Sequence, residues 1–252
     1  MSRDFAELDF RKTPLGDLSL RRRRVRVLDD LEVFEVKLGE AFLMSSLFHE
    51  VEVALADLGL AALDAGSGTG EARYDVVIGG LGLGYTAVAA LKHSSVRELI
   101  VVDALETVID WHQRGLVPLG STLTQDPRCR FVHADFFALA ASEAGFDPSS
   151  AQRRFHAILL DIDHSPRNLL HPRHGSFYSP AGLRQLAVHL EENGVFALWS
   201  DDPPDDDFLR MLGGTFAKVE AHIVKFANPL LEQESASTVY VASGLSRGAK
   251  SR

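Results

Sequence analysis

A chain of 252 residues that is 46% apolar and 24% charged suits one globular α/β domain with a small addition better than two full domains. The single cysteine, Cys129, excludes an internal disulfide and a cysteine-rich metal site. The formal charge of −9 argues against nucleic-acid binding and favours a cationic partner. Because neither a signal peptide nor a long apolar span is found, we expect a cytoplasmic protein that does not enter a membrane.

The first part of the chain, residues 1–45, predicts a small antiparallel β appendage. Short β-like stretches occur at Leu18–Val27, Leu31–Leu38 and Ala41–Met44, with turn-forming residues between them. The run Arg21–Arg24 is interpreted as a solvated or edge-protecting face, and a patch for an anionic ligand is the alternative.

Residues 46–73 predict a helix and a flexible connection. Apolar residues at helical spacing favour a helix over Ser46–Leu63, with Ser46 as a possible N-cap. Asp64–Arg73 contains three glycines and no apolar run, so the boundary with the main domain is expected there.

Residues 74–242 alternate between strand-like and helix-like segments, and residues 243–252 are expected to be a tail. Strands are predicted at Asp75–Gly79, Val96–Asp103, Cys129–Ala134, His156–Asp161, Gly194–Ser200, Ala217–Phe226 and Ser237–Ala242. Helices are predicted at Tyr85–His93, Leu105–Gln113, Phe136–Ala144, Pro180–Glu192 and Asp207–Leu212. This alternation predicts a Rossmann-like, seven-stranded, mostly parallel sheet with helices on both faces and an antiparallel final pair.

The stretch Tyr74–Leu91 predicts a strand, a tight glycine turn and a helix. Such a turn lets a ligand approach the backbone, while the first N–H groups of the new helix point outward. The spacing is Gly80-x-Gly82-x-Gly84, and Tyr85 stands where a dinucleotide motif would have its last glycine. The glycines alone indicate a nucleotide site only weakly.

Acidic residues at successive strand ends strengthen this prediction. Asp103, Asp135, Asp161 and Asp201 each end or follow a predicted strand, and ligands of open α/β sheets bind at that edge. Asp103 follows Gly84 at close to the roughly 20-residue interval of a ribose-binding acid. The alternative is a solvated strand end that caps the next helix.

In these motifs, from about residue 40 to residue 242, the chain resembles the spermidine synthase (polyamine aminopropyltransferase) family, whose core is that of class I S-adenosylmethionine methyltransferases. The similar segments are Phe48-His49-Glu50-Val51, Val77–Gly84, Asp103–Ile109, His133-Ala134-Asp135, and Leu160-Asp161 followed by Phe177-Tyr178. The resemblance implies a donor site formed by Gly79, Gly80, Leu81, Gly82, Gly84, Asp103, Ala104, Asp135, Phe136 and His49. It implies S-adenosylmethionine or its decarboxylated form as co-substrate, no metal, a small-molecule amine, possibly a polyamine, as acceptor, and a homodimer.

Three departures from the family pattern shape the functional prediction. Gly82 replaces the loop aspartate that holds the donor's aminopropyl ammonium, and no other carboxylate lies in that turn. Without that charge the site no longer repels the carboxylate of ordinary S-adenosylmethionine, so methyl transfer is favoured over aminopropyl transfer. The segment Asp161–Ser165 also differs from Asp-x-x-Asp-Pro, and the amino-terminal strands lack the family's acceptor motifs.

Asp161 is the predicted proton acceptor for the attacking amine, with a loop-stabilising acid as the alternative. Asp163 and His164 are further catalytic candidates, although a loop histidine is commonly a surface residue. His171–His174 invites a metal interpretation, but Asn168–Phe177 is better explained as a lid over the acceptor.

Two other functions stay open on the sequence alone. A nicotinamide oxidoreductase fits the strand order, although the glycine spacing and Asp135 do not favour it. A non-catalytic nucleotide-binding protein fits the altered segment after Asp161.

Overall fold

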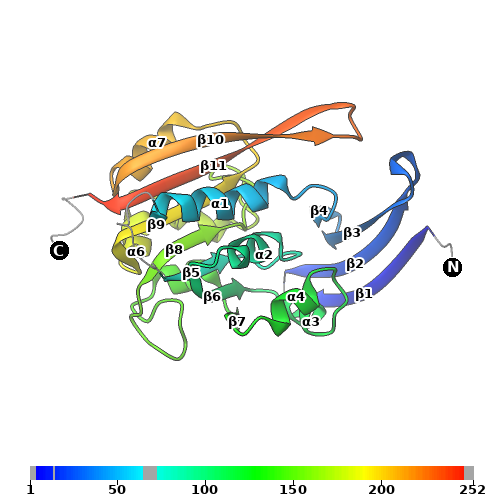
Figure 1. The fold of residues 1–252 in the computed structure, drawn as a ribbon, viewed down its shortest axis with the longest axis horizontal. Coiled ribbons are helices and arrows are strands. Elements are labelled where there is room, and N and C mark those ends of the chain that lie inside the picture. The colour runs from blue at the N-terminus through cyan, green and yellow to red at the C-terminus, as the bar shows by residue number, and fades with distance from the viewer. Residues whose placement is uncertain (1–3, 14, 65–72, 247–252) are drawn as a thin grey trace.

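The computed structural model describes residues 4–13, 15–64 and 73–246, which form a small and a large β-sheet (Figure 1). The small sheet is antiparallel and has the order β1-β2-β3-β4. Its strands are β1 (Phe5–Thr13), β2 (Gly16–Val25), β3 (Leu31–Leu38) and β4 (Ala41–Ser45). The predicted amino-terminal β appendage is therefore confirmed. The sequence analysis missed β1, an edge strand whose side chains are mostly exposed or half-buried and so give no clear apolar pattern.

The large sheet has seven strands in the order β10-β11-β9-β8-β5-β6-β7. They are β5 (Tyr74–Gly79), β6 (Val96–Asp103), β7 (Cys129–His133), β8 (Phe155–Leu160), β9 (Leu190–Ser200), β10 (Phe216–Asn228) and β11 (Gln233–Leu245). The strands from β5 to β9 are parallel, whereas the β10–β11 hairpin is antiparallel. The predicted Rossmann-like sheet and its antiparallel final pair are confirmed.

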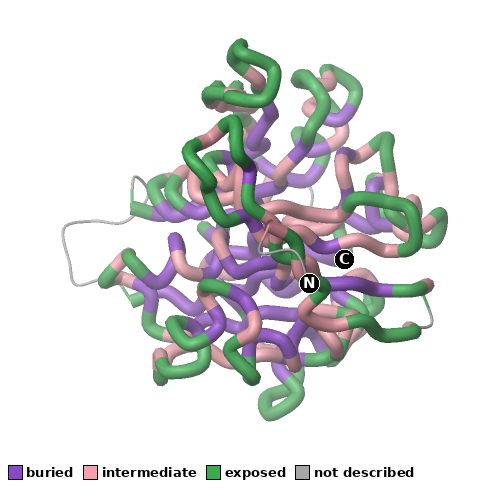
Figure 2. Tube along the Cα trace, turned by 90° about the vertical axis from the view of Figure 1, so that its right-hand side faces the viewer, coloured by how far each residue is buried: buried purple, intermediate pink, exposed green. Residues whose placement is uncertain are grey.

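Helices cover both faces of the large sheet. One apolar core lies under α1 (Glu50–Asp64), α2 (Tyr85–Lys92), α3 (Glu106–Gln113) and α4 (Gly120–Gln125). The other core lies under α5 (Phe136–Ala141), α6 (Pro180–Ala187) and α7 (Asp206–Gly213). Alternate residues of a strand enter opposite cores, as Ile158 and Leu159 do in β8. The central strands are accordingly buried, with exposed segments around them (Figure 2).

Several predicted boundaries were wrong. Ser46 does not cap α1, which begins at Glu50; the Ser46 hydroxyl instead accepts the Phe34 N–H at 2.9 Å. The helix predicted over Pro180–Glu192 ends at Ala187, because Leu190 already pairs with Phe155 as part of β9. The short helix α4 was missed, and β11 continues to Leu245, into the expected tail.

The small sheet shares its core with the large domain. Leu18, Leu20 and Val36 are buried in the same apolar cluster as α1 and β5, and Trp111 of α3 donates a hydrogen bond to Asp9 of β1 at 2.8 Å. Most of the connection predicted over Asp64–Arg73 lies outside the described residues. Among the helices that are described, none is long and apolar enough to cross a membrane.

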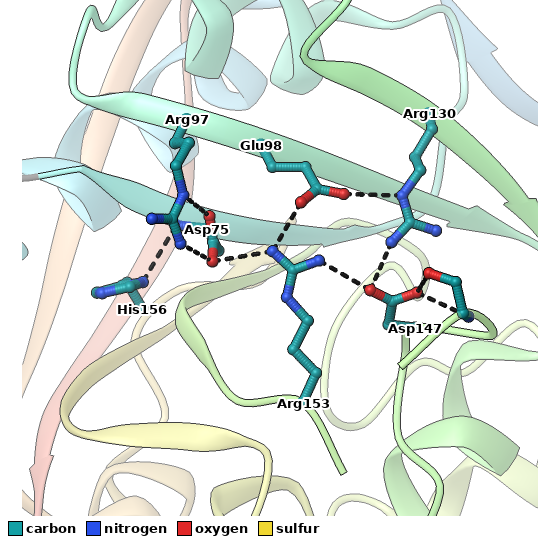
Figure 3. Close-up of polar contacts among 8 residues, drawn as sticks. Asp75, Arg97, Glu98, Arg130, Asp147, Arg153 and His156 are labelled. Carbon is teal, nitrogen blue, oxygen red and sulfur yellow. Dashed lines mark hydrogen bonds and ion pairs between the residues drawn. The ribbon is translucent and has the colours of Figure 1, made fainter. Parts of the chain in front are cut away.

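An ion-pair network ties together the amino ends of the parallel strands (Figure 3). Arg153, just before β8, lies 2.9 Å from Asp75 of β5, 2.7 Å from Glu98 of β6 and 2.8 Å from Asp147. The side chains of Asp75 and Asp147 are almost fully buried. Their arginine partners lower the pKa of both carboxyl groups, which stay charged and balanced inside the fold.

We expect Arg153→Met to lower the free energy of unfolding by about 3 kcal/mol, because the substitution leaves buried carboxylates without their shared partner. Urea denaturation measures the change. Arg22→Met is the control: its pair with Glu32 is exposed, with a 3.6 Å separation, and its loss should cost less than about 1 kcal/mol. Equal losses in the two variants would contradict this account of the network.

Candidate donor and acceptor site

The glycine turn after β5 lies at the carboxyl edge of the parallel strands. Gly80, Gly82 and Gly84 have φ angles of 96°, 50° and 94°, a region that residues with a Cβ rarely adopt. A Cβ on Gly80 would lie 2.0 Å from the carbonyl oxygen of Asp161. The turn can therefore pack directly on the end of β8 only because position 80 is glycine.

Asp103, at the end of β6, holds the turn in place. One carboxylate oxygen accepts the Leu81 N–H at 2.9 Å, and the other accepts the Leu105 N–H at 2.7 Å. Burial raises the pKa of Asp103, and hydrogen bonds from backbone N–H groups, Gly82 among them, oppose that rise. Asp103 thus holds the glycine turn instead of capping α3 as a solvated strand end, and its role toward a ribose stays a prediction.

His112 of α3 is a further support of the turn, which the sequence analysis did not identify. Its buried Nε2–H donates to the carbonyl oxygen of Gly82 at 2.9 Å. Burial lowers the pKa of His112, so the imidazole is held in its neutral form. Met44 of β4 closes the other side, since its Sδ lies 3.2 Å from where a Cβ of Gly82 would stand.

Asp161 follows β8 and faces α2. The Thr86 hydroxyl donates to its carboxylate at 2.8 Å. Burial raises the pKa of Asp161 to about 6, and the Thr86 hydrogen bond opposes the rise. Its carboxyl group is therefore half-buried against the start of α2, and its pKa lies near neutral pH.

The other two predicted catalytic residues have different surroundings. The buried Asp163 carboxylate accepts hydrogen bonds from Leu170 N–H at 2.7 Å, His174 Nδ1–H at 2.8 Å and the Tyr178 hydroxyl at 3.0 Å. These contacts organise the segment that the sequence analysis interpreted as a lid. His164 is half-buried and meets Trp199 of β9 edge to face, with ring centroids 6.4 Å apart.

The remaining predicted donor residues are distributed around the turn. Asp135 is exposed and caps α5 through one oxygen, Oδ1, to Phe137 N–H at 2.9 Å and Ala138 N–H at 3.2 Å. Phe136 is buried beneath Gly79, so its side chain belongs to the core. Ala104 is exposed, and its carbonyl accepts the His133 Nε2–H at 3.2 Å.

His49 stacks on Tyr85 at 4.4 Å, and its Nδ1 is buried with no partner among the described residues.

Glu52 of α1 is an acid that the sequence analysis did not identify. Burial and then the charge of Asp161 raise its pKa to about 8. Its position was detectable in the sequence, because it precedes the buried residues Ala56 and Gly59 at helical spacing. The turn itself, residues 79–84, contains no carboxylate. The acid nearest to Asp161 in its electrostatic surroundings is Glu52, which belongs to the neighbouring helix α1.

The charged segments His171–His174, Asp201–Asp207 and Arg21–Arg24 form contacts within the chain. His174 of the His171–His174 segment pairs with Asp163, and no cluster of metal-ligating side chains occurs within residues 4–13, 15–64 and 73–246. In the acidic run after β9, Asp205 caps α7 and pairs with Arg167. In the basic run, Arg23 pairs with Glu35 at 2.6 Å, as a surface interpretation predicts.

The sheet order, the glycine turn and the acids at the ends of β6, β7 and β8 are those of a Rossmann-like fold of the S-adenosylmethionine methyltransferase type. No family model matches the chain. A polyamine aminopropyltransferase of Pyrobaculum islandicum is 27% identical over 121 residues, which are 48% of this chain and 39% of the relative. Polyamine aminopropyltransferase 2 of Pseudomonas aeruginosa is 29% identical over 187 residues, 70% of this chain and 46% of the relative.

The solved structures agree with these relatives. Spermidine synthase from Thermotoga maritima superposes with a TM-score of 0.68 over 94% of this chain and 72% of its own, at 17% identity. A spermidine synthase in complex with the transition-state analogue AdoDATO gives the same TM-score at 18% identity, over 94% of this chain and 73% of its own. The chain is spermidine-synthase-like in sequence and in fold, and its matches span less than half the length of the curated relatives.

We expect Glu52→Gln to change how stability depends on pH. With a pKa of about 8 in the folded protein and an ordinary value of 4.5, Glu52 binds a proton more tightly when folded. Its stabilising contribution is complete below pH 4.5 and is lost as the pH rises toward 8. Between pH 5 and pH 8, the wild type should therefore lose more unfolding free energy than the variant, on the order of 3 kcal/mol.

Urea denaturation across this pH range measures the difference. Glu143→Gln, at an exposed acid after α5, should keep the wild-type dependence. Parallel profiles for wild type and Glu52→Gln would contradict the buried position of the Glu52 carboxyl group.

Proposed function

We propose that this chain transfers an aminopropyl group from decarboxylated S-adenosylmethionine to an amine. The observation that carries the proposal is the position of Asp161 at the end of β8: its backbone carbonyl lies directly against Gly80 of the glycine turn, and its half-buried carboxyl group accepts the Thr86 hydroxyl at 2.8 Å. The site joins a nucleoside-binding turn to an acid that titrates near neutral pH.

The curated relatives support aminopropyl transfer rather than the methyl transfer favoured by the sequence analysis. Both are named polyamine aminopropyltransferases. The expectation of methyl transfer rested on the charge missing at Gly82, and the half-buried carboxyl group of Glu52 now lies near Asp161. A bound ammonium would favour the ionised form of Glu52, whereas the carboxylate of ordinary S-adenosylmethionine would be repelled by the charge of Asp161.

The donor's adenosine would lie along the carboxyl edge of the sheet. The backbone of the turn, from Gly79 to Gly84, would face the nucleoside, with the ribose hydroxyls on Asp103. Asp135 and the backbone of Phe136 would contact the adenine, because the cap of α5 uses only Oδ1 of Asp135. His49, with its unpartnered Nδ1, would approach from α1.

The chemistry is an in-line displacement. The lone pair of the acceptor nitrogen forms a bond to the propyl carbon next to sulfur, the carbon–sulfur bond breaks, and its electrons neutralise the sulfonium to give methylthioadenosine. The nitrogen must also lose a proton, which Asp161 accepts and passes to water. Holding amine and donor in contact supplies much of the rate acceleration.

Asp163 and His164 take supporting roles in this proposal. The three hydrogen bonds of Asp163 hold the segment up to Tyr178, so Asp163 positions the lid rather than reacting. His164, beside Trp199, is placed to orient the acceptor. The amine acceptor, a polyamine by analogy with the relatives' names, the homodimer and the cytoplasmic location stay predictions.

Asp161→Asn is expected to lower kcat at least about 100-fold, because the amine loses its proton acceptor. Product formation with decarboxylated S-adenosylmethionine and a panel of polyamines measures turnover, and calorimetry with methylthioadenosine measures nucleoside binding. Nucleoside affinity should stay within about threefold of the wild type, since the adenosine contacts lie elsewhere. Asp30→Asn, at an exposed acid between β2 and β3, should leave both values unchanged.

Each alternative function has its own result in this assay. Unchanged turnover in Asp161→Asn would exclude it as the proton acceptor. Methyl transfer from ordinary S-adenosylmethionine would support the methyltransferase activity that the sequence analysis favoured. Binding of NADH without binding of any sulfonium nucleoside would favour an oxidoreductase, and binding without turnover on any amine would favour a non-catalytic protein.

A further inference from the structure

Helix α1 runs along β8 with its amino end toward the nucleoside site. Its last residue, Asp64, accepts a hydrogen bond from the Tyr74 hydroxyl at 2.9 Å, at the amino edge of the sheet (Figure 1). One helical turn earlier, a Cβ on Gly59 would lie 2.7 Å from Leu159 of β8 and 3.4 Å from Ala197 of β9. The first turns of α1 therefore reach the carboxyl edge, where β8 ends.

Glu52 and Asp161 meet at this edge. Glu52 precedes Gly59 by two helical turns on the same face of α1. Asp161 follows Leu159 by two residues, so both point to the face of the sheet that α1 and α2 cover. Two neighbouring residues of α2 contact this region: the Thr86 hydroxyl donates to Asp161, and the ring of Tyr85 stacks on His49.

No cation of the described chain balances these two acids. Neither Glu52 nor Asp161 forms an ion pair with a lysine, arginine or histidine of residues 4–13, 15–64 or 73–246. Within the part of the chain that the structure describes, the Glu52 carboxyl group accepts a hydrogen bond from its own backbone N–H and from no other residue, and His49 Nδ1, one turn earlier, has no partner. At the opposite edge of the sheet, Arg153 forms ion pairs with three carboxylates. Acids that lack a cationic partner are therefore found at the carboxyl edge and not at the Arg153 network.

We propose that Glu52 is the specificity-determining residue that binds the terminal ammonium of the decarboxylated donor, in place of the carboxylate missing at Gly82. The inference rests on the proposed function. Asp161 remains the proton acceptor, and its charge adds to the attraction. An ammonium inserted between buried carboxyl groups forms charge-assisted hydrogen bonds, whereas the carboxylate of ordinary S-adenosylmethionine is repelled there.

Calorimetric titration of three nucleosides tests the proposal. Wild type, Glu52→Gln and the control Glu143→Gln, at an exposed acid after α5, are each titrated with decarboxylated S-adenosylmethionine, S-adenosylmethionine and methylthioadenosine. In Glu52→Gln, we expect affinity for the decarboxylated donor to fall at least about tenfold, and affinity for methylthioadenosine, which has no ammonium, to stay unchanged. Affinity for S-adenosylmethionine should be equal or higher, and Glu143→Gln should match the wild type.

The contrary results separate this inference from the proposed function. If Glu52→Gln binds all three nucleosides as the wild type does, Glu52 does not select the donor, and the proposed function stands. If the variant loses all three equally, its role is structural and the inference is also wrong. If the wild type binds none of the three, the proposed function itself is wrong.

Discussion

The contact between the glycine turn and the carboxyl ends of β6 and β8 is the constraint on which the site depends. Asp103 accepts N–H groups of the turn, and Gly80 lies directly against the backbone of Asp161. His112 holds the turn from a third direction, through the carbonyl oxygen of Gly82. A backbone with positive φ angles is kept in one conformation because donors and acceptors around it are paired.

The acidic side chains at the two edges of the parallel sheet have different partners. At the amino edge, Arg153 and its neighbouring arginines pair with every carboxylate of the network, whose pKa values are lowered accordingly (Figure 3). At the carboxyl edge, burial raises the pKa values of Glu52 and Asp161. Paired charges suit a structural edge, and acids without a protein cation suit a site that receives a cationic ligand.

The small sheet and α1 complete the site from outside the nucleoside-binding core. Met44 of β4 lies beside Gly82, and Trp111 of α3 anchors β1 through Asp9. Helix α1 then brings Glu52 to the end of β8. An acid at this edge can therefore come from any element packed on it, and its carboxyl group ionises more readily when a cation binds beside it.

The sequence alone determined the fold class, the glycine turn and the edge at which Asp103, Asp135 and Asp161 lie, because strand periodicity and strand ends are local patterns. It did not determine that Asp163 is enclosed by Leu170, His174 and Tyr178, or that His112 holds Gly82. Only the tertiary structure decided those contacts and the approach of Glu52 to Asp161. They join residues far apart in the chain, and their charge states depend on burial that no local pattern records.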